Sequence, residues 1–184
     1  MVSGDDFRTT LGTFATGVTV VTFTLDGDDH ALTVNSFTSL SLDPRWCCGT
    51  VTSTRALTIS SKADNYAVNI LTEDQEELST RFAGQHHEMD DPFEGIDLFR
   101  SETGAPIFED TLAYLDCTID ARHEGGDHTI FVGRVEDAAV QNPDEQPLIF
   151  FRGITRNSPS SLPDTRTGHT GRTGRLVSLR SVRG

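Results

Sequence analysis

Two short segments hold the side chains of this sequence that are best suited to chemistry, and the first is unusually rich in hydroxyl groups. It runs from Thr33 to Pro44 and reads Thr-Val-Asn-Ser-Phe-Thr-Ser-Leu-Ser-Leu-Asp-Pro. The hydroxyls, the amide and the free backbone groups of such a segment can line a polar small-molecule ligand. The residue pattern alone is equally consistent with a strand covered by solvent.

The second segment carries a histidine directly after a glycine turn and reads Gly-Gly-Asp-His-Thr over residues 125–129. A strand that begins after the turn would hold His128 in place while its imidazole reaches into a cleft. A single histidine in a turn is, taken by itself, more often an ordinary surface residue. The segment therefore supports a functional role for His128 only together with other motifs.

Other motifs that could carry chemistry are incomplete. The pair His86-His87, followed by Glu88, lacks the spacing of a zinc-binding HExxH helix. Three cysteines, Cys47, Cys48 and Cys117, lack the CxxC spacing of a structural zinc site, and their odd number argues against a disulfide framework. Residues 12–19 have the glycine spacing of a P-loop but no lysine, and they precede a strand. We therefore expect no metal site and no Rossmann or P-loop nucleotide site.

Composition limits the partners and the location of the chain. The net charge is -13, and Lys62 is the single lysine. An acidic surface repels nucleic acid and anionic lipid, so we expect neither partner. No run of 18 apolar residues could span a membrane, and the acidic N-terminus lacks the features of a signal peptide. We expect a protein of the reducing cytoplasm.

The elements that would position the two segments are mostly strands. Runs of β-branched and aromatic residues predict strands, and capping-box patterns predict helices. We expect strands over residues 17–25, 31–42, 46–51, 66–71, 107–122, 129–140 and 147–151, helices over 5–15, 54–62 and 72–82, and a long loop over 84–106. So few helices cannot alternate with strands as a parallel sheet requires. A closed or split β-barrel is the fold class that this pattern favours.

The last part of the chain differs in composition. Residues 157–184 are rich in Ser, Pro, Thr, Gly and Arg, and from Arg156 onward six arginines face the single acid Asp164. Such a segment cannot bury enough apolar surface to offset the entropy of ordering it. We therefore expect one folded domain over residues 1–156 and a flexible basic tail over 157–184.

Seven motifs in one order reveal a family resemblance. They are residues 15–22 (ATGVTVVT), 33–44, 66–71 (YAVNIL), 81–84 (RFAG), 104–106 (GAP), 126–129 (GDHT) and 147–153 (PLIFFRG). In this order the chain resembles the flavin reductase-like family, the FMN-binding split barrels, over roughly residues 7–156. Each motif is weak alone, and the ordered set is specific.

The resemblance implies a mainly β fold, a six-stranded Greek-key split barrel with a few short helices, and a homodimer with FMN or FAD near the dimer interface. The implied activity is transfer of a hydride from NADH or NADPH to the flavin. The reduced flavin would then supply a separate partner monooxygenase. An alternative is an FMN-binding electron-transfer protein that never oxidises NAD(P)H, and another is a flavin-free interaction protein that acts through its basic tail.

The resemblance also assigns site residues. The isoalloxazine ring of the flavin would contact the stretch Thr33, Val34, Asn35, Ser36, Phe37 and Thr38, largely through backbone groups. Ser53, Thr54 and Arg55 would form a phosphate-binding turn, for which hydroxyls and a guanidinium are well suited. Asn69 would support the site. His128 would be the catalytic residue, near the place where nicotinamide stacks on the flavin.

Overall fold

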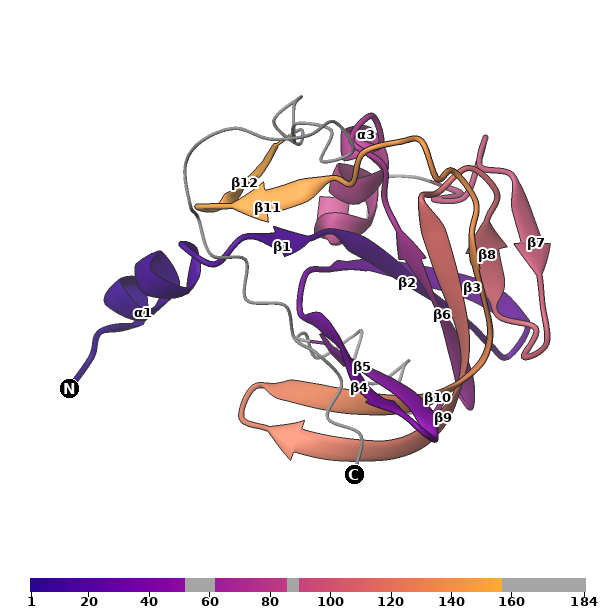
Figure 1. The fold of residues 1–184 in the computed structure, drawn as a ribbon, viewed down its shortest axis with the longest axis horizontal. Helices are drawn as coiled ribbons and strands as arrows, with labels where there is room; N and C mark the ends of the chain where they lie inside the picture. The colour runs from indigo at the N-terminus through magenta and orange to yellow at the C-terminus, as the bar shows by residue number, and fades with distance from the viewer. Residues whose placement is uncertain (52–61, 86–89, 157–184) are drawn as a thin grey trace, which may run out of the picture.

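The computed structural model describes residues 1–51, 62–85 and 90–156. Figure 1 shows a mainly β chain with a separate helix at its N-terminus. Helix α1 spans Gly4–Leu11, and the first strands are β1 (Thr16–Gly17), β2 (Thr19–Leu25), β3 (Asp28–Val34), β4 (Phe37–Leu42), β5 (Arg45–Val51) and β6 (Asn65–Ile70). Then come helix α3 (Glu76–Thr80), the π-helix η1 (Arg81–Gln85), and the strands β7 (Leu98–Arg100), β8 (Pro106–Phe108), β9 (Ala113–Gly125), β10 (His128–Val140), β11 (Ile149–Phe151) and β12 (Ile154–Arg156).

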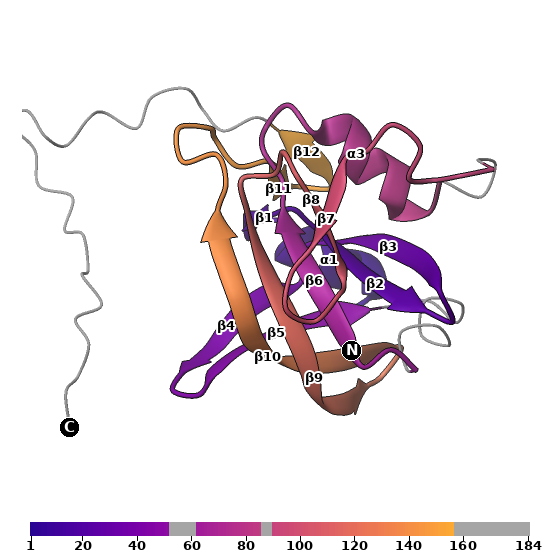
Figure 2. The same ribbon diagram turned by 90° about the vertical axis from the view of Figure 1, so that its right-hand side faces the viewer.

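One antiparallel sheet of seven strands, in the order β3-β2-β6-β9-β10-β5-β4, forms the body of the molecule. Its two edge strands, β3 and β4, follow one another in the chain with only Asn35 and Ser36 between them. Three Cα steps span at most about 11 Å, so the opposite edges of the sheet must come together at this point. The sheet is therefore curled around an interior, as Figures 1 and 2 show. The mainly β split-barrel class is confirmed, with seven strands in the sheet where the resemblance implies six.

The strand predicted over residues 31–42 is the clearest error of the sequence analysis. It is two strands, β3 and β4, which lie at opposite edges of the same sheet. The β propensity of the segment is continuous, but the chain leaves one edge at Val34 and joins the other edge at Phe37. The alternation of faces expected across residues 33–39 is therefore broken at Asn35 and Ser36.

The helices follow their capping signals in part. Ser3 caps α1, because its Oγ accepts a hydrogen bond of 3.1 Å from the backbone N of Asp6. The helix predicted over residues 72–82 begins later than expected, at Glu76. There the Gln75 side chain accepts a hydrogen bond from the backbone N of Thr72 at 3.0 Å and closes the turn before the helix. The helix expected over residues 54–62 and the tail over 157–184 lie outside the described residues, except for Lys62. No helix in the described part of the chain is long and apolar enough to cross a membrane.

The interior of the curled sheet is apolar. Its buried cluster includes Phe23, Tyr66, Val68, Cys117 and Phe131. A second cluster packs α3, η1 and β8 against the outside of the sheet. Cys47 and Cys117 belong to the same core cluster and are both buried, with their sulfur atoms 3.5 Å apart.

Gly133 of β10 leaves the space that a neighbouring aromatic ring fills. A Cβ atom at Gly133 would lie 2.3 Å from the Tyr66 hydroxyl oxygen and 2.7 Å from the ring carbon that carries it. Both distances are shorter than any normal contact, and Tyr66 is buried and cannot swing away. A residue with a side chain at position 133 must therefore displace the Tyr66 ring from the core.

We expect Gly133→Ala to lower the free energy of unfolding by about 1–3 kcal/mol, because it overpacks the core at Tyr66. Urea titration followed by circular dichroism measures the change. Gly17→Ala is the matched control, since a Cβ at Gly17 meets no atom within 4 Å. Equal stability of the two variants would contradict this account of the core.

Candidate active site

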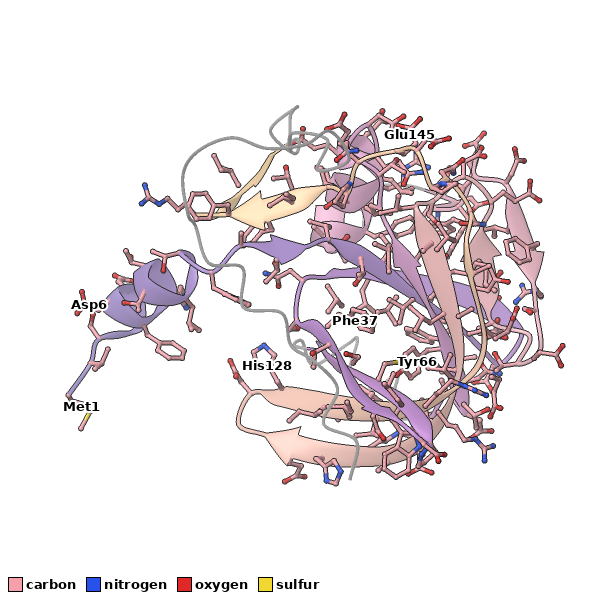
Figure 3. The ribbon with its side chains drawn as sticks, in the orientation of Figure 1. Met1, Asp6, Phe37, Tyr66, His128 and Glu145 are labelled. Carbon is pink, nitrogen blue, oxygen red and sulfur yellow. The ribbon has the colours of Figure 1, made fainter. Side chains whose placement is uncertain are left out.

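The strand register brings the two chemically promising segments to the same end of the barrel. Phe37 of β4 lies opposite Gly49 of β5, and Gly49 lies opposite Phe131 of β10. Both β4 and β10 are antiparallel to β5, so they run in the same direction. Asn35 and Ser36, which precede Phe37, therefore lie toward the same end of the barrel as His128, which precedes Phe131. Two strand spacings separate β4 from β10, which corresponds to about 10 Å. Figure 3 shows Phe37 and His128 on the same open side of the barrel.

The first two residues of the predicted flavin-contacting stretch are anchored to neighbouring elements. The Thr33 hydroxyl donates a hydrogen bond of 2.6 Å to the carbonyl oxygen of Ser79 in α3. Val34 is buried, and its carbonyl oxygen accepts a 2.7 Å hydrogen bond from the Thr19 hydroxyl in β2. Both residues therefore fix the point from which the chain leaves β3.

The next residues are the ones that the structure presents at the opening. Asn35 and Ser36 are exposed and belong to no strand. Phe37 is half-buried and packs against the apolar interior, while Thr38 is exposed and its hydroxyl donates to the carbonyl of Ser39 at 3.3 Å. The link over residues 35–36 thus combines an amide, a hydroxyl and backbone groups outside the strand ladders, and rigid strands hold it at both ends.

His128 begins β10 directly after the tight turn that Gly126 makes with a φ of 74°. Its Nδ1 lies 2.6 Å from Oδ1 of Asp127. This hydrogen bond with His128 holds the pKa of the Asp127 carboxyl below its ordinary value, so Asp127 is ionised at neutral pH. An ionised carboxylate can only accept, and Nδ1 must therefore carry the proton and donate it. The other ring nitrogen, Nε2, remains available to a ligand.

Asn69 is not brought to this opening. It is fully buried, and its Nδ2 donates hydrogen bonds to the Val20 carbonyl at 3.0 Å and to the Thr22 hydroxyl at 3.1 Å. Its Oδ1 accepts from the backbone N of Phe108 at 2.9 Å. The side chain thus ties β2, β6 and β8 together, and any support that it lends to the site is exerted through the positions of these strands.

The remaining predicted site residues, Ser53, Thr54 and Arg55, lie outside the described residues. Sequence reasoning assigned no role to Asp127 or to the Ser79 carbonyl. The signal for Asp127 was visible, since an acid directly before a histidine in a tight turn can pair with its ring. The contact between Thr33 and Ser79 joins residues 46 positions apart and had no local signal. Among the described residues no three His, Cys, Asp or Glu side chains gather as a metal site would require.

Comparison with known proteins adds a consistent set of relatives. The family model described as "Flavin reductase like domain" matches residues 11–158. The reductase subunit HsaB of a flavin-dependent monooxygenase from Mycobacterium tuberculosis is 41% identical over 150 residues, which are 80% of this chain and 78% of that protein. An NADH-dependent flavin reductase from a Rhodococcus species is 41% identical over 155 residues, or 82% of this chain and 84% of that protein.

Solved structures agree with these sequence relatives. The flavin reductase PheA2 superposes with a TM-score of 0.77 at 35% identity, covering 86% of this chain and 99% of that one. The NADH:FAD oxidoreductase SgcE6 of Streptomyces globisporus, solved in complex with NAD and FAD fragments, gives a TM-score of 0.78 at 34% identity. That match covers 89% of this chain and 99% of the other.

The buried hydrogen bonds of Asn69 lead to a prediction about stability. We expect Asn69→Ala to lower the free energy of unfolding by about 2–4 kcal/mol, because it leaves buried backbone groups of β2 and β8 without partners. Asn35→Ala removes the same side chain at an exposed position and should change stability by less than about 0.5 kcal/mol. Thermal and urea unfolding of the two variants measure the difference. A loss at position 69 no larger than at position 35 would show that the amide network is not structural.

Proposed function

Because this chain belongs to the flavin reductase-like domain family, we propose that it is the reductase component of a two-component flavin monooxygenase. It transfers a hydride from NADH or NADPH to FMN or FAD. Curated relatives that are 41% identical over the aligned residues carry names of this activity, including NADH-dependent flavin reductase and reductase subunit of a flavin-dependent monooxygenase. The observation that carries the proposal for this chain is the register that sets residues 33–38 and His128 at one end of the barrel.

The link over Asn35 and Ser36 fits the flat, polar ring system of a flavin. An isoalloxazine presents carbonyl oxygens and ring nitrogens along its edge and an apolar face, and so needs both donors and a surface to lie on. Backbone and side-chain groups of the link supply the donors, and Phe37 supplies apolar surface beside them. Thr33 and Val34 do not need to touch the ring, since their anchoring hydrogen bonds keep the link in one position. Ser53, Thr54 and Arg55 are proposed to hold the flavin phosphate.

The flavin supplies the hydride acceptor, and the protein supplies alignment and exclusion of water. His128 stands about two strand spacings across the opening from the link. The Asp127 carboxylate accepts a hydrogen bond from Nδ1 of His128 and orients the ring, so that Nε2 faces a bound nicotinamide. In this proposal Nε2 orients the nicotinamide amide or stabilises charge that develops during the transfer.

The assembly and location are proposed on the same basis. The chain forms a homodimer, with the flavin near the interface, and releases reduced flavin to a separate monooxygenase. A cytoplasmic location fits the use of a nicotinamide donor and the two unpaired buried thiols of Cys47 and Cys117. Residues 1–156 form the catalytic domain, and the basic tail over 157–184 is not needed for the reaction.

A direct test is anaerobic oxidation of NADH and NADPH by the full chain with added FMN or FAD, followed by nicotinamide absorbance. The expected result is turnover that rises with the concentration of free flavin, and a version ending at Arg156 should retain it. Binding of FMN without any nicotinamide oxidation would instead support an FMN-binding electron carrier. Activity lost with the tail would refute the assignment of catalysis to residues 1–156.

The role of His128 has a matched control in the same hairpin. We expect His128→Ala to lower kcat/KM for NADH roughly ten- to hundred-fold, because the nicotinamide loses a positioned partner. Flavin affinity, measured by quenching of flavin fluorescence, should stay nearly constant. His123 lies exposed on β9 of the same hairpin, and His123→Ala should leave both quantities unchanged. Identical kinetics of the His128 variant and the wild type would remove His128 from the mechanism.

A further inference from the structure

Helix α1 carries an arginine on the side of the molecule where the β9–β10 turn ends in His128. Arg8 lies in the last turn of the helix. In Figure 1 the helix and the start of β10 both lie at the left, and in Figure 2 both lie behind the barrel. Figure 3 shows His128 at the end of β10 on this side. Two separate elements, the β9–β10 turn and α1, therefore face the space in which the nicotinamide is proposed to bind.

The charge of Arg8 acts on the β9–β10 turn. The pKa of the Asp127 carboxyl is lowered chiefly by its hydrogen bond and charge attraction with His128, and the positive charge of Arg8 lowers it further. Because attraction between charges falls off with distance, this effect agrees with the placement of α1 beside the turn. An anion that binds at His128 would feel the same positive charge.

Two backbone hydrogen bonds hold the last turn of α1 to the body of the molecule. The N of Gly12 donates to the O of Arg8 at 2.8 Å, and the N of Arg152 donates to the O of Gly12 at 2.8 Å. A Cβ atom at Gly12 would lie 3.2 Å from the Arg8 oxygen and 3.5 Å from the Arg152 Cα. Glycine at this position thus lets the β11–β12 turn approach the helix end closely. The backbone from which the Arg8 side chain extends is therefore fixed relative to the barrel.

The guanidinium of Arg8 is free to bind a ligand. Its one ion pair is with Asp5, at 3.3 Å, and the two side chains are 82% and 95% exposed. Ion pairs this exposed contribute little to stability, so a phosphate can replace the Asp5 carboxylate. Arg81 and Arg100 differ, because both also donate hydrogen bonds to backbone carbonyl groups.

A positive charge is needed on this side of the molecule. The chain has a net charge of -13, and Asp5, Asp6 and Asp127 are all exposed here. NADH and NADPH each carry a pyrophosphate with two negative charges. An acidic surface lowers the local concentration of such a molecule unless a cation offsets the repulsion. Arg8 is placed to supply that cation.

We propose that Arg8 binds the pyrophosphate of the nicotinamide donor. The inference rests on the proposed function, since it adds a donor-binding residue to that reaction. In the dinucleotide, one ribose separates the nicotinamide from the pyrophosphate. A donor with its nicotinamide at His128 can therefore extend its pyrophosphate toward α1, outside the apolar interior. A guanidinium presents two parallel N–H groups to phosphate oxygens, which suits this role.

Steady-state kinetics of the full chain with saturating flavin test the proposal. Arg8→Gln should raise KM for NADH roughly ten-fold, because a charge-assisted hydrogen bond to the donor is lost. The kcat should change little, since the pyrophosphate is held equally in the ground state and the transition state. Arg8→Lys should recover most of the affinity as a point charge. Arg134→Gln is the control, because Arg134 pairs with Glu136 at 2.8 Å farther along β10, and its KM should equal that of wild type.

Two further comparisons separate phosphate binding from a structural role of Arg8. Reduced nicotinamide riboside is a hydride donor without phosphate, so Arg8→Gln and wild type should use it equally well. Asp5→Asn breaks the same ion pair but leaves the guanidinium in place, so it should not raise KM for NADH. An equal loss with both donors, an Asp5→Asn variant as impaired as Arg8→Gln, or an unchanged KM in Arg8→Gln would each overturn the inference.

Binding of ADP-ribose, measured by titration calorimetry, tests the site without turnover. ADP-ribose keeps the pyrophosphate and lacks the nicotinamide, and Arg8→Gln should raise its dissociation constant roughly ten-fold. Binding that depends on Arg8 in a wild type that never oxidises NADH would refute the proposed function and leave the phosphate site standing. A wild type that oxidises NADH, with ADP-ribose bound equally by Arg8→Gln, would refute the inference alone.

Discussion

Two residues join the opposite edges of a seven-stranded sheet, and this short crossing controls the architecture. Because only Asn35 and Ser36 separate β3 from β4, the sheet cannot lie open, and its edges are drawn together at one end. Residues at the crossing cannot pair within a ladder, since the strands on either side belong to different edges. The same constraint that curls the sheet therefore creates a short stretch of polar, accessible backbone at the rim of an apolar interior.

Several buried polar side chains are bonded to the chain itself. The hydroxyls of Thr19 and Thr22 donate to backbone carbonyl groups, and the amide of Asn69 is bonded to β2 and β8. Strand polarity then decides what faces the crossing. Antiparallel pairing of β4, β5 and β10 makes the start of β10 meet the end of the barrel where the crossing lies, so the turn that ends in His128 stands opposite residues 35–36.

Local patterns predicted the elements well and the connections poorly. The hairpin around Gly126, the strand after Asp64, the cap at Ser3 and the turn at Thr72 all have signals within a few residues, and each marks a real element or turn. The break at residues 35–36 has no such signal, because it is imposed by strands that are distant in sequence. Asn69 is a second case in which local sequence does not reveal a tertiary contact. An amide in a strand suggests a ligand-binding residue, but the structure shows that the Asn69 amide is hydrogen-bonded to backbone groups of β2 and β8.

Hydroxyl-rich composition proves to be an ambiguous guide to ligand contact. In the stretch from Thr33 to Thr38, the first hydroxyl bonds to α3 and the last to its neighbour's carbonyl, so the groups best placed for a ligand are backbone groups and the exposed amide of Asn35. Hydride transfer between two bound ring systems requires that the rings are aligned and that water is excluded, and it requires no nucleophilic side chain. Backbone groups held by two strands supply that geometry with less freedom than side chains would, because their positions are fixed by the fold. A site built from a crossing between sheet edges is thus suited to a reaction whose reactive atoms belong to the ligands.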